Sequence, residues 1–600
     1  MIEFCTRLKG DVILTHVVET VDDLEGFRAF IKANRRVIGF DTETTGLDIY
    51  AAEGFRVRLA QFGNAVESWI IPLDREWDGY DKQFAADVVG ALRYVEKLVT
   101  QNGKFDVLVS DEHLDITAEE LFPKLLDSQV LAKLIDSRPA EKGGFGHSLE
   151  ELTIKFIDRE VGEKIKGSMK VLAKAYKTTK EKIWSKVDLW DPTYLTYAAF
   201  DPCLAFRLAR ILTRKVPASA RPLIRFEHEV VEVCGYMERA GFLLDEPYTR
   251  GLREDLMRKE ADWVEKARVM GVENINSTDQ CADAFERRGV FIKGRTPSGK
   301  RKVDKNFLKE RVDAGDELAS AIVEGKRAGK WRKTWIDSFL DGMDANGRCH
   351  AGINTLQART GRMSITGIPA QTLPSGDWMI RRCFVAEEDH VILSTDFSNM
   401  ELRVLAAASG DKRMLKAFRD GEDLHQITAD AAGVDRKAGK GTNFTVCFGG
   451  GWKAVVEQYG VSEEMARKAV DAFWETYPGV KAFADKLQKE ARRNGYITTA
   501  SGRRLMVDKD RPYAALNYYI QSSARDITCR ALLRMHKAQL TRFMRLPIHD
   551  EVVFSVPKQH AEKAAKMTAE LMQEVFKGLI VPTDPEVGLR SWGSLYGADA

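Results

Sequence analysis

The chain has 600 residues, too many for one hydrophobic core, and this length predicts roughly three to four domains. With 44% hydrophobic and 30% charged residues, the composition is typical of a soluble globular protein and excludes a disordered or fibrous one. The net charge of +2 comes from 91 basic and 89 acidic residues, so net charge by itself selects no class of partner. Basic clusters at 298–305, 325–335 and 435–441 suit a polyanionic partner, although a solvated surface is the commoner role of such clusters.

The sequence lacks the patterns of membrane segments, targeting signals and metal-binding cysteine pairs. It contains no run of about 18 apolar residues, and its start lacks the apolar core and cleavage site of a signal peptide. We therefore expect a cytoplasmic protein with no membrane partner. The eight cysteines are scattered singly without a CxxC pair, which indicates reduced, mostly buried thiols and neither a zinc site nor a disulfide framework.

The first half of the chain has an α/β pattern up to about residue 212. Strands are predicted at 35–46 and 57–63, and helical periodicity covers 84–99 and 201–215. Proline and small residues at 215–223 then mark a domain boundary. We expect one domain at 1–215 and a second region at 216–600.

The second region begins with charged amphipathic patterns from about 224 to 345, which predict helices. Strands are predicted again at 390–398 and 549–556, with a helical block between them. The expected fold class is therefore multidomain, α/β followed by α+β.

Asp41 and Glu43 lie in the first predicted strand. The period of two places them on one face, about 7 Å apart along the chain, where one divalent cation could bridge them. For this pair alone, exposed acids at a strand end are the commoner interpretation.

Two further carboxylates in the first half have polar companions four residues away. Asn102 precedes Asp106 by four residues, and Tyr197 precedes Asp201 by four, so each pair is predicted to share one helical face. With the strand pair they form a candidate set of four carboxylates for hard divalent cations.

In this order and at these separations, the three segments resemble the 3′-5′ proofreading exonuclease domain attached to DNA polymerases. The resemblance implies an RNase H-like fold in which Asp41, Glu43, Asp106 and Asp201 hold two Mg²⁺ ions. It also implies that Tyr197 orients the attacking water. Mn²⁺ could substitute for Mg²⁺, because both accept oxygen ligands.

Two more aspartates in the second half lie at predicted strand ends. Asp396 ends the apolar run that begins at 391, and Asp550 lies within His-Asp-Glu at 549–551, just before another strand. Each alone is more often a turn residue or helix cap. Together they are candidates for a two-metal site.

Arg436, Lys440, Phe444 and Phe448 recur every four residues, so on a helix they form one row. An ordinary amphipathic helix with its aromatics in the core would explain the rings and leave the cations unexplained. The row could instead hold a triphosphate at its basic end and stack a base at its aromatic end.

These segments resemble a family A DNA polymerase, the class of bacterial DNA polymerase I and many phage replicases. The segments that carry the resemblance are 396–403, 436–449 and 549–551, with weaker ones at 358–364, 369–374, 423–429, 501–505 and 517–527. The resemblance implies a right-hand polymerase. Its expected parts are a thumb at about 224–345, a palm at about 346–415 and 500–600, and fingers at about 416–499.

The resemblance also implies residue roles at the polymerase site. Asp396 and Asp550 would bind two catalytic Mg²⁺ ions, while Arg436, Lys440 and His425 would contact the phosphates of the incoming nucleotide. Lys440 could also protonate the departing pyrophosphate.

Further roles concern the sugar, the base pair and the DNA. Phe444 would pack on the sugar and imply poor use of dideoxynucleotides, and Glu401 would fill the space that a ribose 2′-hydroxyl needs. Contacts to primer, template or the minor groove of the new pair would come from Arg362, Asn517, Gln521 and His549.

The sequence departs from the family pattern at three positions. Phe448 replaces a tyrosine whose hydroxyl would restrain Glu401, so we expect a less restrained Glu401 and weaker ribonucleotide exclusion. Tyr513 stands where arginine is common, with Arg511 nearby, and Thr445 replaces a glycine.

The expected partners are primer-template DNA and dNTPs, in phage-type replication by a monomer. The stretch before Asp41 is too short for a 5′ nuclease, so two activities are expected. A processivity factor or a helicase-primase could bind as well. Two alternatives are an exonuclease whose second half only grips DNA and a non-catalytic scaffold, but both carboxylate sets and Lys440 are complete.

Overall fold

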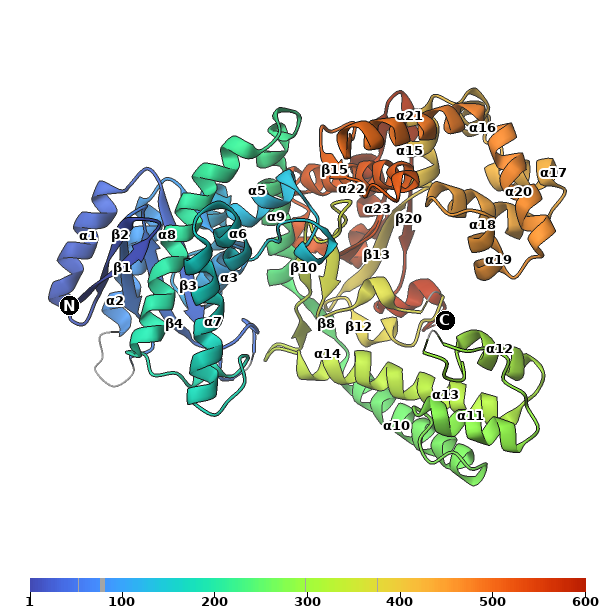
Figure 1. The fold of residues 1–600 in the computed structure, drawn as a ribbon, viewed down its shortest axis with the longest axis horizontal. Helices are drawn as coiled ribbons and strands as arrows, with labels where there is room; N and C mark the ends of the chain where they lie inside the picture. Colours follow the sequence, from blue (N-terminus) through green and yellow to red (C-terminus); the bar gives the residue numbers. More distant parts are fainter. Residues whose placement is uncertain (52, 76–80, 297, 375, 600) are drawn as a thin grey trace.

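The computed structural model describes residues 1–51, 53–75, 81–296, 298–374 and 376–599. An N-terminal α/β domain lies at the left of Figure 1, and the rest of the chain surrounds a second sheet. Across these ranges, every helix is too short or too polar to cross a lipid bilayer. The cysteines are free, and all except Cys5 are buried, which confirms the expected thiols.

The N-terminal domain is built on a seven-stranded mixed sheet. The predicted strands at 35–46 and 57–63 are confirmed, but the helix predicted at 84–99 is α2 (Asp81–Tyr94) followed by a buried strand. Short apolar runs do not distinguish a buried strand from a helix end, which explains the error. The strand order is β1 (Ile2–Leu8), β2 (Asp11–Val17), β5 (Glu67–Pro72), β4 (Val57–Gly63), β3 (Ile38–Thr44), β6 (Leu98–Thr100) and β7 (Leu125–Asp127).

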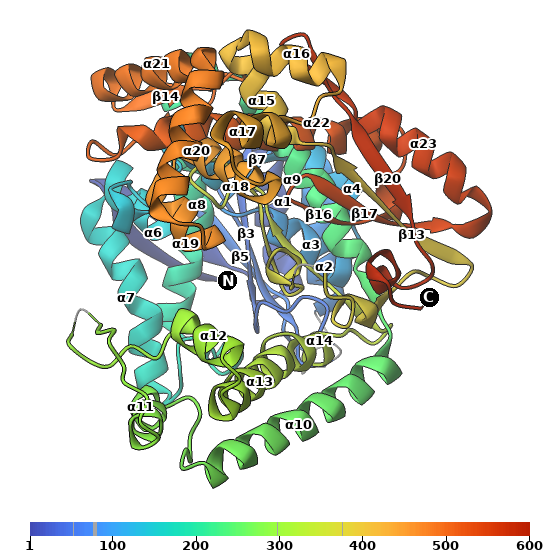
Figure 2. The same cartoon turned by 90° about the vertical axis from the view of Figure 1, so that its right-hand side faces the viewer.

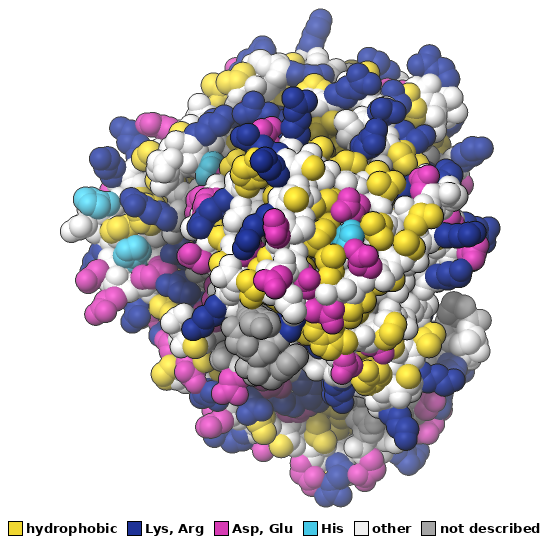
Figure 3. Space-filling model, turned by 90° about the vertical axis from the view of Figure 1, so that its left-hand side faces the viewer, with side chains coloured by type: hydrophobic (Ala, Val, Ile, Leu, Met, Phe, Trp, Pro, Cys, Tyr) yellow, Lys and Arg dark blue, Asp and Glu magenta, His cyan; other side chains and the backbone are white. Residues whose placement is uncertain are grey.

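Helix α8 (Pro192–Lys215) packs across β3 and β4. The approach is close because Gly39 has no side chain: a Cβ there would lie 2.0 Å from the carbonyl oxygen of Pro202. Since Asp201 directly precedes Pro202, this contact places its carboxylate over β3. The side of the molecule on which this domain lies has basic side chains along its upper edge, and acidic and apolar ones are mixed in its middle (Figure 3).

Helix α9 (Pro222–Ala240) joins the two halves. It packs against α5 (Ser128–Ile135) of the N-terminal domain and against α22 (Ala515–Lys537) of the C-terminal half. The chain then forms β8 (Phe242–Leu244), which pairs with β9 (Arg348–Cys349) and β12 (Phe384–Val385). The expectation of helices throughout 224–345 is therefore wrong at β8, where a three-residue apolar stretch is buried by pairing.

The remaining helices of this region form a separate lobe at the lower right of Figure 1. Its long helix α10 (Glu246–Val269) packs along α13 (Glu317–Trp331), and the lobe has a hydrophobic cluster of its own. The other helices of the lobe are α11 (Thr278–Arg287), α12 (Lys305–Asp313) and α14 (Asp337–Asp341).

The second sheet has four antiparallel strands, and it confirms the strands predicted at 390–398 and 549–556. Helix α23 (Ala561–Met572) covers one face, where the hydroxyls of Thr395 and Thr568 lie 2.9 Å apart. The strand order is β16 (Met544–Ile548), β17 (Glu551–Pro557), β13 (His390–Phe397) and β20 (Thr583–Val587).

A second helical lobe lies on the opposite side of this sheet from the α10 lobe (Figures 1 and 2). Its helices are α16 (Lys412–Asp420), α17 (Leu424–Ala432), α18 (Arg436–Cys447), α19 (Trp452–Tyr459), α20 (Glu463–Thr476) and α21 (Pro478–Asn494). Two lobes flanking a central sheet are the arrangement expected of a right hand. The residue limits of palm, fingers and thumb stay a prediction.

Candidate active sites

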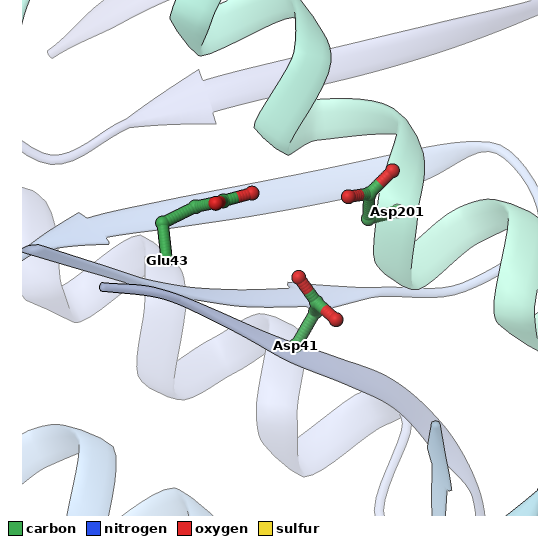
Figure 4. A group of neighbouring side chains, drawn as sticks. All are labelled: Asp41, Glu43 and Asp201. Atoms are coloured by element: carbon green, nitrogen blue, oxygen red, sulfur yellow. The ribbon is translucent and has the colours of Figure 1, made fainter. Parts of the chain in front are cut away.

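Asp41, Glu43 and Asp201 converge in the N-terminal domain. Strand β3 supplies the first two and α8 the third, and one oxygen of each lies within 4.8 Å of the others. Figure 4 shows the three carboxylates turned toward one another. This is the arrangement by which acidic side chains can share a hard divalent cation.

Asp106 lies on α3 (Lys104–His113), beside this group but outside it. Its Oδ1 accepts hydrogen bonds from the Thr42 backbone N–H at 3.1 Å and from the Thr42 hydroxyl at 2.7 Å. Asn102 precedes the helix in a left-handed conformation, with φ of 64°. The prediction that Asn102 shares a helical face with Asp106 is therefore wrong, because Gly103 caps the helix after it.

The electrostatics of the four carboxylates fit a cation. Burial, followed by repulsion from neighbouring carboxylates, raises the pKa of Asp41, Glu43 and Asp201 well above the usual range. Burial raises the pKa of Asp106 to about 7. Among the described residues, Asp201 Oδ1 has no hydrogen-bond partner although it is buried. A bound cation would satisfy this oxygen and offset the repulsion.

Tyr197 stands one helical turn before Asp201, as predicted, and its ring meets Trp184 edge-on at 5.6 Å. The nearby Tyr197 side chain partly counters the rise in the pKa of Asp201. A cavity of about 560 Å³ opens beside Glu43, lined also by Trp184 and Leu47. Leu47 is 86% exposed, so apolar surface lies next to the carboxylates.

A second acidic group forms on the four-stranded sheet. Asp396 pairs in register with Glu551 on β17 and with Asp584 on β20, so these three side chains lie on one face. Asp550 lies in the turn between β16 and β17, and its carbonyl accepts a hydrogen bond from Phe397 N–H at 3.3 Å. The paired aspartates predicted from strand ends thus lie side by side.

Loss of hydration, followed by repulsion from Glu551, raises the pKa of Asp396 to about 6. Burial, followed by repulsion from Asp396 and Glu401, raises the pKa of Asp550 to about 7. Glu551 and Asp584 were not predicted from the sequence to belong to this acidic group. Glu551 was visible in the His-Asp-Glu segment, whereas Asp584 joins the group only through strand pairing.

A small cavity beside Asp550 is lined by Arg362, Glu401 and His549. Arg362 and Glu401 form an ion pair, although they are 39 residues apart. Glu401 therefore has an arginine as its partner where the tyrosine hydroxyl is missing, and that it is less restrained than it would be by a tyrosine stays a prediction.

The row on α18 points outward. Arg436 and Lys440 are exposed, Phe444 is half-buried and Phe448, directly after the helix, is 39% exposed. The two rings are nearly parallel, with centroids 6.2 Å apart, and Arg436 pairs with Asp423 at 2.6 Å. The alternative of aromatics facing the core is wrong.

The opposite face of α18 packs on α17. His425 Nδ1 lies 3.0 Å from the Asn443 amide, and its ring lies 5.6 Å from that of Phe444. Gly439 permits this contact, because a Cβ there would lie 2.4 Å from the His425 carbonyl oxygen. His425 is thereby held beside the row, with its ring next to Phe444. Burial lowers the pKa of His425, and the two cations of the row are near enough for their charges to lower it further.

The predicted DNA-contacting residues Asn517 and Gln521 lie on α22. Gln521 accepts a hydrogen bond from the Thr360 hydroxyl at 3.3 Å, while Asn517 Oδ1 has no partner among the described residues. Tyr513 and Thr445 are the other two positions that differ from the family pattern. The Tyr513 hydroxyl accepts a hydrogen bond from Arg511 Nε at 3.0 Å. Nothing in the structure explains Thr445.

Comparisons with known proteins agree with this arrangement. The model of "DNA polymerase family A" matches residues 246–594, and that of "3'-5' exonuclease" matches residues 16–217. The chain is 52% identical to a DNA polymerase of Mycobacterium phage L5 and 50% identical to one of phage D29, each over the full length of both chains. It is 32% identical to the thermostable DNA polymerase I of Thermus aquaticus, over 60% of this chain and 47% of that one.

A solved structure of the POL domain of Pol1 from M. smegmatis, in complex with DNA primer-template and dNTP, shares the fold. Its TM-score is 0.75 at 19% identity, over 96% of this chain and 100% of that chain. The family matches cover both carboxylate groups, one in each region. The chain therefore belongs to DNA polymerase family A, and it carries a 3′-5′ exonuclease domain ahead of its polymerase domain.

Proposed function

We propose that the chain extends a primer 3′-hydroxyl along a DNA template with dNTPs, in phage-type replication, and removes mispaired 3′ ends. The observation that carries the proposal is the presence of two separate acidic groups, together with an outward row of two cations and two rings on α18. The phage relatives are named DNA polymerase, and the M. smegmatis structure holds primer-template and dNTP. Both findings support the same substrates here.

Mg²⁺ is the proposed cofactor at both sites, with Mn²⁺ as a substitute. The ligands are all carboxylates with raised pKa, and hard oxygen donors are what Mg²⁺ prefers. The metal would supply activation of the attacking oxygen and charge neutralisation on phosphate.

At the polymerase site, Asp396 and Asp550 would hold the metal. Arg436, Lys440 and His425 would bind the triphosphate, since the two cations are exposed at one end of the row and their charges act on the His425 ring beside it. Lys440 would give its proton to the departing pyrophosphate.

The aromatic end of the row would receive the nucleoside. Phe444 would pack on the sugar, Phe448 would lie against the base, and Glu401 would exclude a 2′-hydroxyl. The primer and template contacts are assigned to Arg362, Asn517, Gln521 and His549, which lie around the small cavity and on α22.

At the exonuclease site, Asp41, Glu43, Asp106 and Asp201 would hold the metal, and Tyr197 would orient water toward the scissile phosphate. The cavity beside Glu43 has room for a frayed 3′ end, and Leu47 offers it an apolar contact. We infer a monomer in the cytoplasm of a bacterial host, with a processivity factor or helicase-primase as further partners. The phage relatives support this setting.

The test is primer extension with wild type, Asp396→Asn and Asp41→Ala on one labelled primer-template, with matched and mispaired 3′ ends. We expect Asp396→Asn to abolish extension while removing the mispair, and Asp41→Ala to extend the matched primer without removing the mispair. If the wild-type protein degrades the primer but never extends it, the second half of the chain only binds DNA and the proposal is wrong.

A further inference from the structure

The loop 355–363 carries Arg362, and it connects β10 (Gly352–Asn354) to β11 (Ser364–Thr366) in the polymerase region. Its residue Leu356, however, is only 3% exposed and belongs to the hydrophobic cluster that the exonuclease domain shares with α9. The start of the loop is thus packed into that shared cluster.

A second contact from the exonuclease domain holds the middle of the loop. The hydroxyl of Ser137, two residues beyond the end of α5, donates a hydrogen bond of 2.6 Å to the carbonyl oxygen of Arg359. Ser137 is 7% exposed, so water replaces this donor poorly if it is lost. Arg359 precedes Arg362 by three residues.

A third contact lies just before the loop. Lys104, the first residue of α3, donates from Nζ to the carbonyl oxygen of Ile353 at 2.7 Å and pairs with Glu238 on α9. The helix that carries the exonuclease residue Asp106 therefore also touches the strand that leads into the loop.

The polymerase side fixes the same loop from the other direction. The Arg359 guanidinium donates to Asp508 at 2.6 Å and to the Tyr518 hydroxyl at 3.1 Å. Thr360 bonds Gln521, and Arg362 then reaches Glu401. Both domains thus determine where the arginine stands.

We propose that Ser137 and Leu356 are positioning residues of the polymerase site, through which the exonuclease domain holds the loop that presents Arg362. The inference rests on the proposed role of Arg362 in contacting the primer or the new base pair. Loss of the Ser137 donor leaves the carbonyl of the half-buried Arg359 without this partner, and the loop can relieve this by shifting. A small shift at its tip is enough to weaken a contact that depends on orientation.

The experiment uses the full chain and measures kcat/KM for insertion of one correct dNTP. Ser137→Ala should lower it about threefold to tenfold, and Ser137→Thr, which keeps a hydroxyl, should restore most of it. The matched control is Ser168→Ala, since that hydroxyl bonds Ile165 O at 2.9 Å within the exonuclease domain. Degradation of single-stranded DNA should stay within about twofold for both alanine variants.

The double variant Ser137→Ala/Arg362→Ala separates positioning from a general structural effect. If Ser137 acts through Arg362, the double variant inserts no more slowly than Arg362→Ala alone. The inference is overturned if Ser137→Ala lowers kcat/KM for insertion as much in the Arg362→Ala variant as it does in wild type. It is also overturned if Ser137→Ala does not lower this kcat/KM in wild type. If Arg362→Ala inserts dNTPs at the normal rate, Arg362 does not contact the primer or the new base pair, and the inference is wrong. The polymerase function is then still supported by loss of extension in Asp396→Asn.

Discussion

Arg362 is the charged partner of Glu401 in the described structure, and it is also the residue assigned to the primer or the new base pair. In the proposed role, one guanidinium would serve two positions that a tyrosine hydroxyl and an arginine would otherwise divide between them. If Arg362 contacts DNA as proposed, Glu401 loses this ion pair. Ribonucleotide exclusion should therefore be weak in the working enzyme.

Phe448→Tyr should strengthen ribonucleotide exclusion, because the added hydroxyl can hold Glu401 while Arg362 is engaged with DNA. The measured quantity is kcat/KM for a ribonucleotide divided by kcat/KM for the matching deoxynucleotide. One hydrogen bond to a charged group should decrease this ratio about threefold to tenfold. Single-nucleotide insertion measures both values. The control is Tyr513→Phe, which removes a hydroxyl that bonds Arg511 instead. An unchanged ratio for Phe448→Tyr would count against the shared arginine.

Helix α8 and strand β3 show how a contact between elements places a carboxylate of the candidate site. The helix can lie against the strand because Gly39 leaves room for the Pro202 carbonyl, and Pro202 follows Asp201 directly. The geometry of the acidic group therefore depends on a residue without a side chain as much as on the carboxylates themselves.

Gly39→Ala should impair the exonuclease selectively. The added methyl forces α8 away from β3 and moves Asp201 out of reach of Asp41, so degradation of single-stranded DNA should fall about tenfold or more. Extension of a matched primer should stay within about twofold. The matched control is Gly90→Ala, since nothing lies within 4 Å of a Cβ there. Equal loss of both activities would mean that the contact supports the whole chain and not the exonuclease site.

Glu387 connects several strands of the polymerase half. It pairs with Arg545 on β16 at 2.7 Å and with Arg348 on β9 at 2.9 Å, and it also bonds the Ser555 hydroxyl on β17. Burial by itself would raise the pKa of Glu387, but the Arg545 charge and these hydrogen bonds outweigh it and lower the pKa to about 2.

A lowered pKa means that the unfolded chain binds the proton more readily, so Glu387 stabilises the fold above its ordinary pKa of 4.5. This contribution is lost as the pH falls from 4.5 toward 2. Glu387→Gln should therefore lower the free energy of unfolding by about 2 to 3 kcal/mol at pH 7. The decrease in Tm should be the same at pH 8, 7 and 6 and smaller at pH 4, with the exposed Glu388→Gln as control. A decrease that grows toward pH 4 would contradict this sign.

Over the whole molecule, predictions of where residues lie succeeded where the position depends on local pattern. Asp396, Asp550 and the α18 row follow from strand ends and a spacing of four, and the structure places them as expected. The errors concern segments whose neighbours are distant in sequence, such as the strands β6 and β8. Ser137 bonds Arg359 across 222 positions, and no local pattern indicates such a contact.

A buried group of two acids and two arginines ties α9 to α22. Glu227 on α9 is fully buried and accepts hydrogen bonds from Arg525 at 2.6 and 2.7 Å. Arg503 pairs with Glu227 and lies 2.8 Å from Asp526, so the four charges cancel. Helix α22, which carries Arg525 and Asp526, also carries Asn517 and Gln521.

Glu227→Ala should lower the free energy of unfolding of the polymerase half by about 3 to 5 kcal/mol, because it leaves a surplus of buried positive charge. Thermal unfolding measures the change as a drop in Tm. The matched control is Glu229→Ala on the same helix, whose partner Arg225 is 89% exposed, and it should cost less than about 1 kcal/mol. Glu227→Leu combined with Arg525→Met should recover part of the loss, since it removes an acid and a base together. If the double variant is less stable than Glu227→Ala, the contact that joins α9 to α22 depends on the shape and hydrogen bonds of these side chains and not on their charge balance.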